Sequence, residues 1–212
     1  MARLLSSSNM KCEHLRKLAR RRRVVLGSRS PRRVTILKEL GIPFTQMISK
    51  LDESLRDSEL PYQFACRLAR EKALSLSRQA TDCLVLGCDT VVVYENRIWP
   101  KPIDPDDAFE ILSFLSGRTH VVCTALALAE DQQVLADGYE LTEVTFNRVT
   151  PEQIRTYIDT GEPMDKAGAY GIQGMGVFLV DSIRGNLDNV IGLPVTLLDR
   201  LARQAIVELE KQ

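Results

Sequence analysis

The sequence has little of what several large classes of protein require. No apolar run approaches the roughly 20 residues that a helix needs to cross a bilayer. The five cysteines form no C-x-x-C pair and show no zinc-site spacing, and their odd number argues against a disulfide framework. Glycine and proline contribute only 12 and 9 of the 212 residues, which excludes a collagen-like or largely disordered chain. These absences predict a soluble globular protein whose cysteines are buried free thiols.

Familiar catalytic and nucleotide-binding patterns are also missing. The only two histidines, His14 and His120, do not accompany a nucleophilic serine or cysteine in any recognisable arrangement, so a Ser–His–Asp mechanism has weak support. The chain has no G-x-x-x-x-G-K-[ST] and no strand-linked G-x-G-x-x-G, which excludes P-loop and Rossmann sites. Its length and 44% hydrophobic content suffice for one domain, or for two small lobes around a cleft.

The charge is balanced overall but unevenly distributed. Residues 1–33 hold 11 of the 28 lysines and arginines and a single acidic residue, Glu13. The run Arg20–Arg23 is open to several interpretations: nucleic-acid contact, an anionic membrane surface, a transit peptide, or a solvated extension. No aromatic residue interleaves with these charges, as a base-stacking surface would require, so the solvated extension is favoured. We expect a flexible basic extension over residues 1–23 and a single domain over residues 24–212.

Apolar runs alternate with helix-start and helix-stop signals along the rest of the chain. The pairs Ser30-Pro31, Asp104-Pro105 and Thr150-Pro151 are typical of helix starts, and a glycine follows each of these helices. Two neighbouring strand pairs resemble hairpins, so the predicted class is α/β with a mixed, twisted sheet flanked by helices. The predicted strands are residues 24–27, 83–86, 91–94, 121–129, 140–149 and 177–180, and further helices are expected at about 61–79 and after residue 194.

The segment from Gly27 to Arg33 combines features of an anion-binding site. A strand ends there, a small polar loop follows, and a helix begins with Arg32 and Arg33 in its first turn. Free backbone N–H groups and the helix dipole favour an anion at this end of a helix, whereas arginines there oppose the dipole. A bound phosphate would reverse that penalty because guanidinium groups match phosphate oxygens. The alternative is surface arginines that merely tolerate the dipole.

Two further segments place charged residues among apolar ones. Helical spacing puts Lys72 on the same face as Leu68, Ala69 and Leu76, so its ammonium either meets a partner or extends along the core to an opening. Asp89 stands between two apolar runs, which predicts either a pocket at a strand end or a structural turn at Gly87. Lys101, fixed by the proline after it, and Glu53 add charges of undetermined placement.

The segment 164–174 is rich in glycine and carries polar groups suited to a ligand. Glycine allows positive φ and close approach of the backbone to a ligand. Lys166 supplies a charge, and the Gln173 amide offers a donor and an acceptor that complement the imide edge of a pyrimidine. A glycine-rich hairpin without any ligand is the alternative.

Taken together, these stretches resemble the Maf family of nucleoside triphosphate pyrophosphatases over about residues 24–203. The resemblance is carried by Ser28-x-Ser30-Pro31-Arg32-Arg33, Glu53, Arg70-Glu71-Lys72-Ala73, Gly87-x-Asp89-Thr90, Lys101-Pro102, Leu115-Ser116-Gly117-Arg118, the run from Gly161 to Gly174, and Gly192-Leu193-Pro194.

The resemblance implies hydrolysis of the α–β phosphoanhydride of a nucleoside triphosphate in a Maf/ITPase-like fold, with the site between two lobes. It implies that Asp89 is the proton acceptor, and a divalent cation, Mg²⁺ or Mn²⁺, for which Glu53 and Asp89 are candidate ligands. Whether Asp89 deprotonates the attacking water itself or holds the cation that activates it stays open. The remaining residues that it implies are Ser28, Arg33, Lys72 and Lys101 for phosphate, Arg32, Thr90 and Gln173 for the specificity of the dTTP/UTP branch, and Lys166 as a further site candidate.

The resemblance also implies a cytoplasmic homodimer that removes non-standard nucleotides, with modified pyrimidine nucleotides as additional substrates and no membrane or nucleic-acid partner. Two rival functions stay open at this point. One is a division-associated regulatory or nucleic-acid-binding protein, which the basic run would favour. The other is a pyrophosphatase directed at purine nucleotides.

Overall fold

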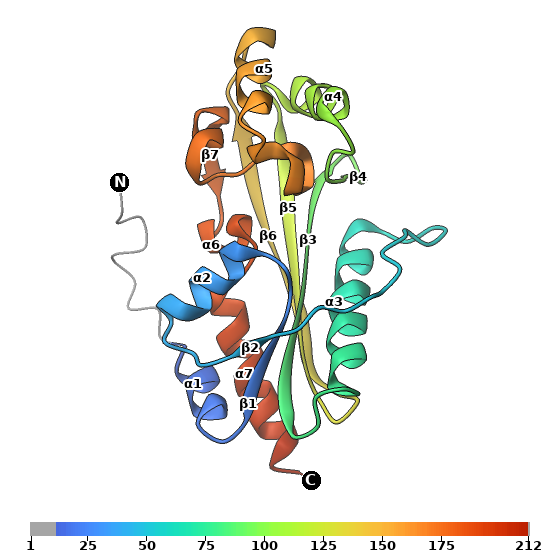
Figure 1. The fold of residues 1–212 in the computed structure, drawn as a ribbon, viewed down its shortest axis with the longest axis vertical. Helices are drawn as coiled ribbons and strands as arrows, with labels where there is room; N and C mark the ends of the chain where they lie inside the picture. Colours follow the sequence, from blue (N-terminus) through green and yellow to red (C-terminus); the bar gives the residue numbers. More distant parts are fainter. Residues whose placement is uncertain (1–11, 212) are drawn as a thin grey trace.

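The computed structural model describes residues 12–211, in which a mixed seven-stranded sheet forms the centre of the molecule (Figure 1). The strand order is β2-β1-β3-β5-β6-β7, and β4 pairs with β3 beside this path. β1 is parallel to β2 and β3, and all other pairs are antiparallel, so the predicted mixed sheet is confirmed. The strands are β1 (Arg23–Gly27), β2 (Thr45–Gln46), β3 (Cys83–Tyr94), β4 (Arg97–Trp99), β5 (Thr119–Glu130), β6 (Gln133–Phe146) and β7 (Val180–Arg184).

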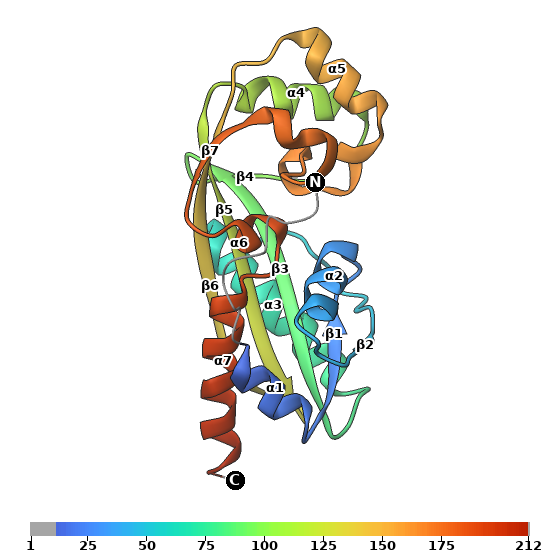
Figure 2. The ribbon, with the colours of Figure 1, turned by 90° about the vertical axis from the view of Figure 1, so that its left-hand side faces the viewer.

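The helices divide the molecule into two lobes joined by the long strands β3, β5 and β6 (Figures 1 and 2). The lower lobe, as drawn, contains α1 (Glu13–Ala19), α2 (Pro31–Glu39), α3 (Pro61–Ser77) and α7 (Val195–Leu209). The upper lobe contains α4 (Pro105–Leu115), α5 (Pro151–Asp159) and the 3₁₀ helices η1 (Glu162–Asp165), η2 (Ala167–Ala169) and η3 (Gly174–Leu179). The short helix α6 (Leu187–Ile191) precedes α7.

β3 is apolar from Cys83 to Cys88 and β5 from Ala125 to Ala129, because the lower lobe covers both faces of the sheet there. Alternate residues of β3 point to opposite sides, so Leu84 and Leu86 pack with α1, α2 and α7, whereas Val85 and Val91 pack with α3. A third core, built around Leu112, lies in the upper lobe. The five predicted free thiols are confirmed as buried: Cys12, Cys66, Cys83, Cys88 and Cys123. Within residues 12–211, no helix is both long and apolar enough to span a bilayer.

The structure corrects the predicted break in the third strand. The sequence indicated two strands, 83–86 and 91–94, with a turn at Gly87 as one of two alternatives between them, but β3 runs from Cys83 to Tyr94 without a break. A Cβ atom on Gly87 would collide with the carbonyl oxygen of Ala69 and lie 2.8 Å from the nitrogen of Ala73. Gly87 therefore allows α3 to pack closely against the sheet and does not mark a turn.

The predicted flexible extension also differs from the structure over residues 12–23. α1 packs against α7, with Leu15 and Leu18 buried, and the Asp199 carboxylate of α7 accepts hydrogen bonds from the backbone N–H of His14 and Leu15. Arg22 forms an ion pair of 2.6 Å with Glu130. The i, i+3 spacing of the two leucines was the available signal for this helix. Residues 1–11 of the predicted extension lie outside the described residues.

Two other boundaries near the C-terminus were wrong. Residues 177–180 were expected to form a strand, but η3 occupies 174–179 and β7 begins only at Val180. The strand expected at 140–149 starts earlier and ends earlier, since β6 spans Gln133–Phe146. α6, which is only five residues long, was not predicted.

His120 should make stability depend on pH. It is 1% exposed, its Nε2 lies 2.8 Å from the Tyr170 hydroxyl, and burial lowers its pKa to about 4. Between pH 6.5 and about 4 the unfolded chain therefore binds a proton that the folded chain does not. We expect the free energy of unfolding to fall with pH across this window by up to about 3 kcal/mol from this group.

The measurement is chemical unfolding of the wild type and of His120→Gln at several pH values from 7 to 4. Carboxylates titrate similarly in both proteins, so the difference between the two curves isolates the histidine. The wild type should lose more stability than the variant as pH falls, and parallel curves would contradict this assignment.

Candidate active site

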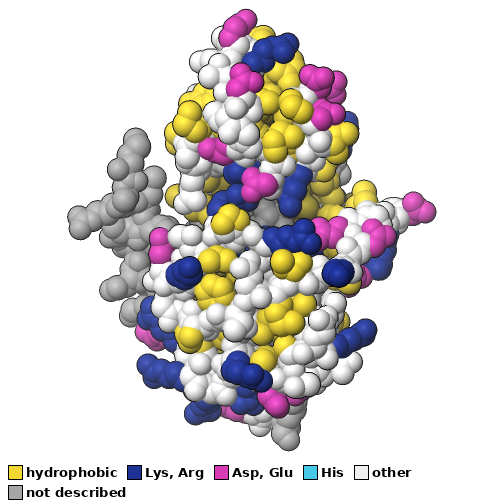
Figure 3. Space-filling view, in the orientation of Figure 1, with side chains coloured by type: hydrophobic (Ala, Val, Ile, Leu, Met, Phe, Trp, Pro, Cys, Tyr) yellow, Lys and Arg dark blue, Asp and Glu magenta, His cyan; other side chains and the backbone are white. Residues whose placement is uncertain are grey.

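A cavity of about 1170 Å³ lies between the two lobes and is lined by residues from both. The space-filling view shows basic and acidic side chains gathered at this level of the molecule (Figure 3). The lower lobe contributes the β1–α2 turn, the segment 48–53 and α3, and the upper lobe contributes residues 165–173. All of the predicted site residues line it, namely Ser28, Arg32, Arg33, Glu53, Lys72, Asp89, Thr90, Lys101, Lys166 and Gln173.

At the centre of the cavity, the Lys72 ammonium bridges two carboxylates. Its Nζ donates to Asp89 Oδ1 at 2.7 Å and lies 3.0 Å from Glu53 Oε1. Lys72 and Asp89 are each 8% exposed, whereas the Glu53 side chain is 55% exposed. A lysine on the buried face of α3 therefore meets a partner and does not simply extend its ammonium to solvent.

The sheet leaves an opening beside Asp89. β1 ends at Gly27, which pairs with Gly87, and β4 pairs with β3 only from Val92 onward. Between these positions β3 pairs with β5 alone, so Asp89 sits in a gap along one edge of an otherwise covered strand. The expectation that Asp89 projects from a strand end is corrected: it lies within β3, and the end that opens the pocket is that of the neighbouring β1.

Arg33 connects the segments around this gap. Its Nε donates to the carbonyl of Gly192, Nη1 to Ser28 Oγ and Nη2 to Thr90 Oγ1, each at 2.8 Å. A weaker contact of 3.4 Å joins Nη1 to the carbonyl of Cys88. Most of its donors are thus satisfied by the protein, and Arg33 is 9% exposed. Within this structure Arg33, Ser28 and Thr90 fix the shape of the β1–α2 turn.

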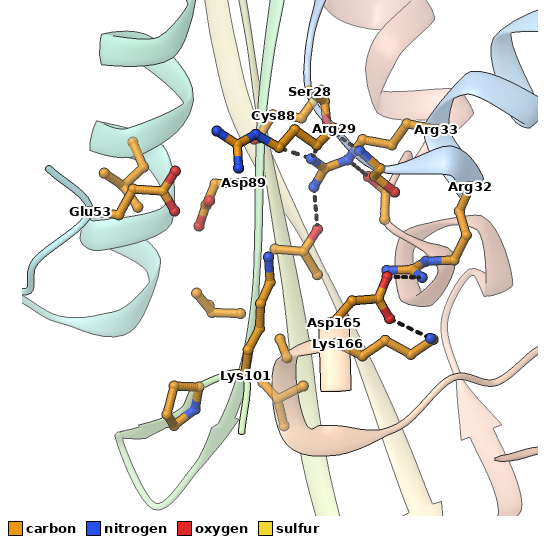
Figure 4. A pocket seen from close by; sticks show the side chains of 18 of the residues that line it. Ser28, Arg29, Arg32, Arg33, Glu53, Cys88, Asp89, Lys101, Asp165 and Lys166 are labelled. Carbon is orange, nitrogen blue, oxygen red and sulfur yellow. Dashed lines mark hydrogen bonds and ion pairs between the residues drawn. The ribbon is translucent and has the colours of Figure 1, made fainter. Parts of the chain in front are cut away.

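Two cations in the cavity differ from Arg33 in this respect. Among the described residues, neither Arg29 nor Lys101 has a hydrogen-bond or ion-pair partner, and both line the cavity. Figure 4 shows the Lys101 side chain reaching into the space between Glu53 and Asp89 on one side and Arg32, Asp165 and Lys166 on the other. Arg29 was not singled out from the sequence, although its place between a strand and a helix N-terminus was an available signal.

On the other side of the cavity, Asp165 joins two predicted site residues. Its carboxylate lies 3.6 Å from Arg32 of the lower lobe and 2.6 Å from Lys166, whose Nζ also donates to the carbonyl of Glu162. Burial raises the pKa of Asp165, but the hydrogen bond from Lys166 and the charge of Arg32 outweigh it, so the pKa is lowered overall. Because the Asp165 side chain is 60% exposed, its contact with Arg32 adds little stability between the lobes.

The carboxylates of the cavity meet only part of what a metal ion needs. Among residues 12–211, no group of three or more His, Cys, Asp and Glu side chains is placed to hold a metal. Glu53 and Asp89 nevertheless provide two hard oxygen ligands at one ammonium group, and Mg²⁺ commonly binds one or two carboxylates together with substrate phosphates and water. The residues therefore fit a metal that arrives with a phosphorylated ligand, but not a closed protein site.

Comparison with known proteins shows which family this chain resembles. A family model described as Maf-like protein matches residues 23–205. The chain belongs to the Maf family. It is 46% identical to the dTTP/UTP pyrophosphatase of Moorella thermoacetica, over 84% of this chain and 93% of that protein. The dTTP/UTP pyrophosphatase of Syntrophomonas wolfei is 45% identical over 81% of this chain and 91% of its own length.

A third relative, the dTTP/UTP pyrophosphatase of Bacillus cereus (strain B4264), is 42% identical over 86% of this chain and 95% of that protein. Among solved structures, a Mycobacterium abscessus nucleoside-triphosphatase, described as a dITP/XTP pyrophosphatase, covers 90% of this Maf chain and 97% of its own. Its TM-score is 0.40 at 13% identity, which carries no argument about fold or substrate.

Proposed function

We propose that this Maf protein hydrolyses dTTP and UTP at the α–β phosphoanhydride, giving the nucleoside monophosphate and pyrophosphate. The proposal is supported by family membership and by relatives of that name at 42–46% identity over most of the chain. The observation that carries it is the buried Lys72–Asp89 pair, which opens into the same cavity as Arg29 and Lys101, two cations without a partner among residues 12–211.

In this proposal Asp89 orients a water molecule and accepts its proton as the water attacks phosphorus. Lys72 holds Oδ1 of the carboxylate in place, so Oδ2 is the oxygen left to accept the proton. Arg29 and Lys101 counter the charge of the triphosphate and the charge that develops on the departing pyrophosphate. Ser28 and Arg33 hold the turn into α2, and we expect the backbone N–H groups of Arg32 and Arg33 to meet phosphate oxygens, since Pro31 has none and that of Ser30 donates to Ser28 Oγ.

A divalent cation, Mg²⁺ or Mn²⁺, belongs to the proposal. Asp89 and Glu53 would hold it together with phosphate oxygens of the substrate. When bound, it would supply Lewis-acid polarisation of a phosphoryl oxygen.

We assign recognition of the base to Gln173, Arg32 and Thr90, in different ways. Gln173 is exposed at the cavity and, within the described residues, its amide has no partner. Arg32 approaches from α2 on the opposite side. The Thr90 hydroxyl is engaged by Arg33 and lies 2.9 Å from Thr124 Oγ1, so we expect it to act by positioning Arg33.

Gln173→Ala should erode the discrimination between pyrimidine and purine triphosphates by about tenfold while changing kcat for dTTP less. Losing hydrogen bonds to one edge of the base costs on the order of 1 kcal/mol, which affects binding of the preferred base most. The measurement is kcat/KM for dTTP, UTP, dATP and dGTP, with the exposed Gln79→Ala as a control. An unchanged ranking of substrates would mean that another residue recognises the base.

The experiment that tests the function is pyrophosphate release from a panel of pyrimidine, purine and deaminated purine triphosphates, with Mg²⁺ and Mn²⁺ in separate series. We expect dTTP and UTP to be the best substrates. Preference for a purine would overturn the pyrimidine assignment.

Tight binding of a polynucleotide without pyrophosphate release would favour a regulatory or nucleic-acid-binding protein. Within the basic run, Arg22 pairs with Glu130 and Arg23 bonds to the carbonyl of Thr81, whereas Arg20 and Arg21 are exposed, so this binding test decides about that rival.

A homodimeric state, a cytoplasmic location and a role in removing non-standard nucleotides complete the proposal. Each rests on membership of the Maf family and on the resemblance described above. Size-exclusion chromatography with light scattering would test the first.

A further inference from the structure

The Glu162 carboxylate lies at the centre of the glycine-rich segment 171–176. Its Oε2 accepts a hydrogen bond from the backbone N–H of Met175 at 2.9 Å, and its Oε1 accepts one from the N–H of Gly176 at 3.2 Å. Oε1 also accepts a hydrogen bond from the Tyr157 hydroxyl at 2.9 Å. One carboxylate therefore satisfies three donors, two of which belong to the backbone of this segment.

The Tyr157 hydroxyl extends this arrangement to the other end of the segment. It accepts a hydrogen bond from the backbone N–H of Gly171 at 3.1 Å while it donates to Glu162. The Tyr157 side chain is 2% exposed, and its burial raises the pKa of the hydroxyl, which keeps this donor protonated. Glu162 is thus bonded directly to Met175 and Gly176, and through Tyr157 to Gly171. Gln173 lies between these anchor points.

The glycines of the segment are explained by the same carboxylate. A Cβ atom on Gly174, which has φ +82°, would lie 2.8 Å from Glu162 Oε2, and one on Gly171 would lie 3.2 Å from Glu162 Oε1. A Cβ atom on Gly176 would lie 2.6 Å from the Tyr157 hydroxyl. At Gly174 and Gly176 a Cβ atom would force a neighbouring group to shift, and at Gly171 the contact with Glu162 would be tighter than usual. The glycines therefore let the backbone wrap around Glu162, and a close approach of this segment to a ligand stays a prediction.

We propose that Glu162 is a positioning residue for base recognition, which acts by fixing the segment that presents Gln173. The inference rests on the proposed function, in which Gln173 reads the base. Glu162 does not itself line the cavity, and it forms no described contact with Lys72, Asp89 or Glu53. Its removal should therefore affect the base end of the substrate and leave the phosphate end intact.

The test is Glu162→Gln, which keeps the size of the side chain and replaces one acceptor oxygen with an NH₂ group. The NH₂ group would face another donor, either the Tyr157 hydroxyl or the backbone N–H of Met175 or Gly176, so at least one hydrogen bond would be lost. We expect KM for dTTP and UTP to rise about tenfold or more, with kcat changed less than about threefold. Inhibition by inorganic pyrophosphate, which lacks a base, should be unchanged. Glu110→Gln, the same substitution on the exposed face of α4, is the matched control and should behave as the wild type.

Hydrogen exchange gives a readout that does not depend on activity. The amides of Gly171, Met175 and Gly176 should exchange faster in Glu162→Gln than in the wild type, while the amides of β3 and β5 keep their protection. Tyr157→Phe, which keeps the buried ring, is a second and milder variant. It should speed exchange at Gly171 and raise KM by a smaller factor.

Three results would overturn the inference. In the first, KM and the ratio of pyrimidine to purine turnover stay at wild-type values in both variants. In the second, kcat and inhibition by pyrophosphate change as much as KM, which would mean a general loss of structure. In the third, exchange at Met175 and Gly176 is unaffected. Absence of pyrophosphate release in the wild type is a separate outcome, which would overturn the proposed function and with it the role in base recognition.

Discussion

Asp89→Asn is expected to lower kcat for dTTP hydrolysis by about 10²-fold or more while the protein still folds. The amide keeps the shape of the side chain but can neither accept a proton from water nor offer a charged oxygen to a cation. Lys72 retains an ion-pair partner in Glu53, so the buried ammonium is not left alone. The measurement is the initial rate of pyrophosphate release at saturating dTTP, with circular dichroism to verify the fold.

A matched control separates catalysis from the loss of an ion pair. Asp137 pairs with Arg70 at 2.6 Å, and neither residue lines the cavity. Asp137→Asn therefore removes the same charge and one ion pair outside the proposed site, and it should leave kcat within about twofold, because exposed pairs contribute little. Near-normal turnover in Asp89→Asn would remove this residue from its proposed role.

Lys72→Met should abolish most of the activity and also destabilise the protein. The methionine keeps the apolar stem on the buried face of α3 but removes the ammonium that holds both Asp89 and Glu53. Turnover should fall by about 10²-fold or more, since the carboxylate is no longer oriented and the two negative charges repel the substrate. The free energy of unfolding should fall by about 3 kcal/mol, because a nearly buried carboxylate loses its partner.

The double variant Lys72→Met/Asp89→Asn distinguishes these two effects. It removes the uncompensated charge, so we expect it to recover much of the lost stability, measured by denaturant unfolding, without recovering pyrophosphate release. Lys17→Met, on the exposed side of α1, is a control for the loss of one lysine. If Lys72→Met unfolded at the wild-type denaturant concentration and turned over dTTP normally, the pair would be neither structural nor catalytic.

The predicted helices of the upper lobe show what local sequence can specify. Asp104 and Thr150 were expected as N-caps, and each side chain accepts a hydrogen bond from the backbone N–H three residues later. The prediction that Lys72 lies on the apolar face of α3 is also confirmed, because helical periodicity alone decides which residues share a face. Short-range signals of this kind need no knowledge of the remaining chain.

Where the sequence signals failed, the cause was usually a distant contact. Glycine is common in turns, but Gly87 belongs to a continuous strand, and its missing side chain leaves room for α3 to pack closely. The glycines after residue 170 have the composition of a ligand-binding loop, but they surround a carboxylate that the sequence analysis had not singled out. In both cases the glycine is needed for close packing, but the sequence alone does not identify the segment or side chain that packs against it.

Local sequence patterns were therefore enough for the α/β class, the starts of α2, α4 and α5, the buried thiols, the Maf motifs and the charged residues of the site. Only the tertiary structure decided how they are used. It ends β1 two residues before the level of Asp89 and folds the 171–176 segment around Glu162. It also satisfies Arg33 with protein acceptors, whereas Arg29 and Lys101 have no partner in the part of the chain that the structure describes. The physical reason is that periodicity and capping act over a few residues, whereas the partner of a buried charge is chosen by segments far apart in the chain.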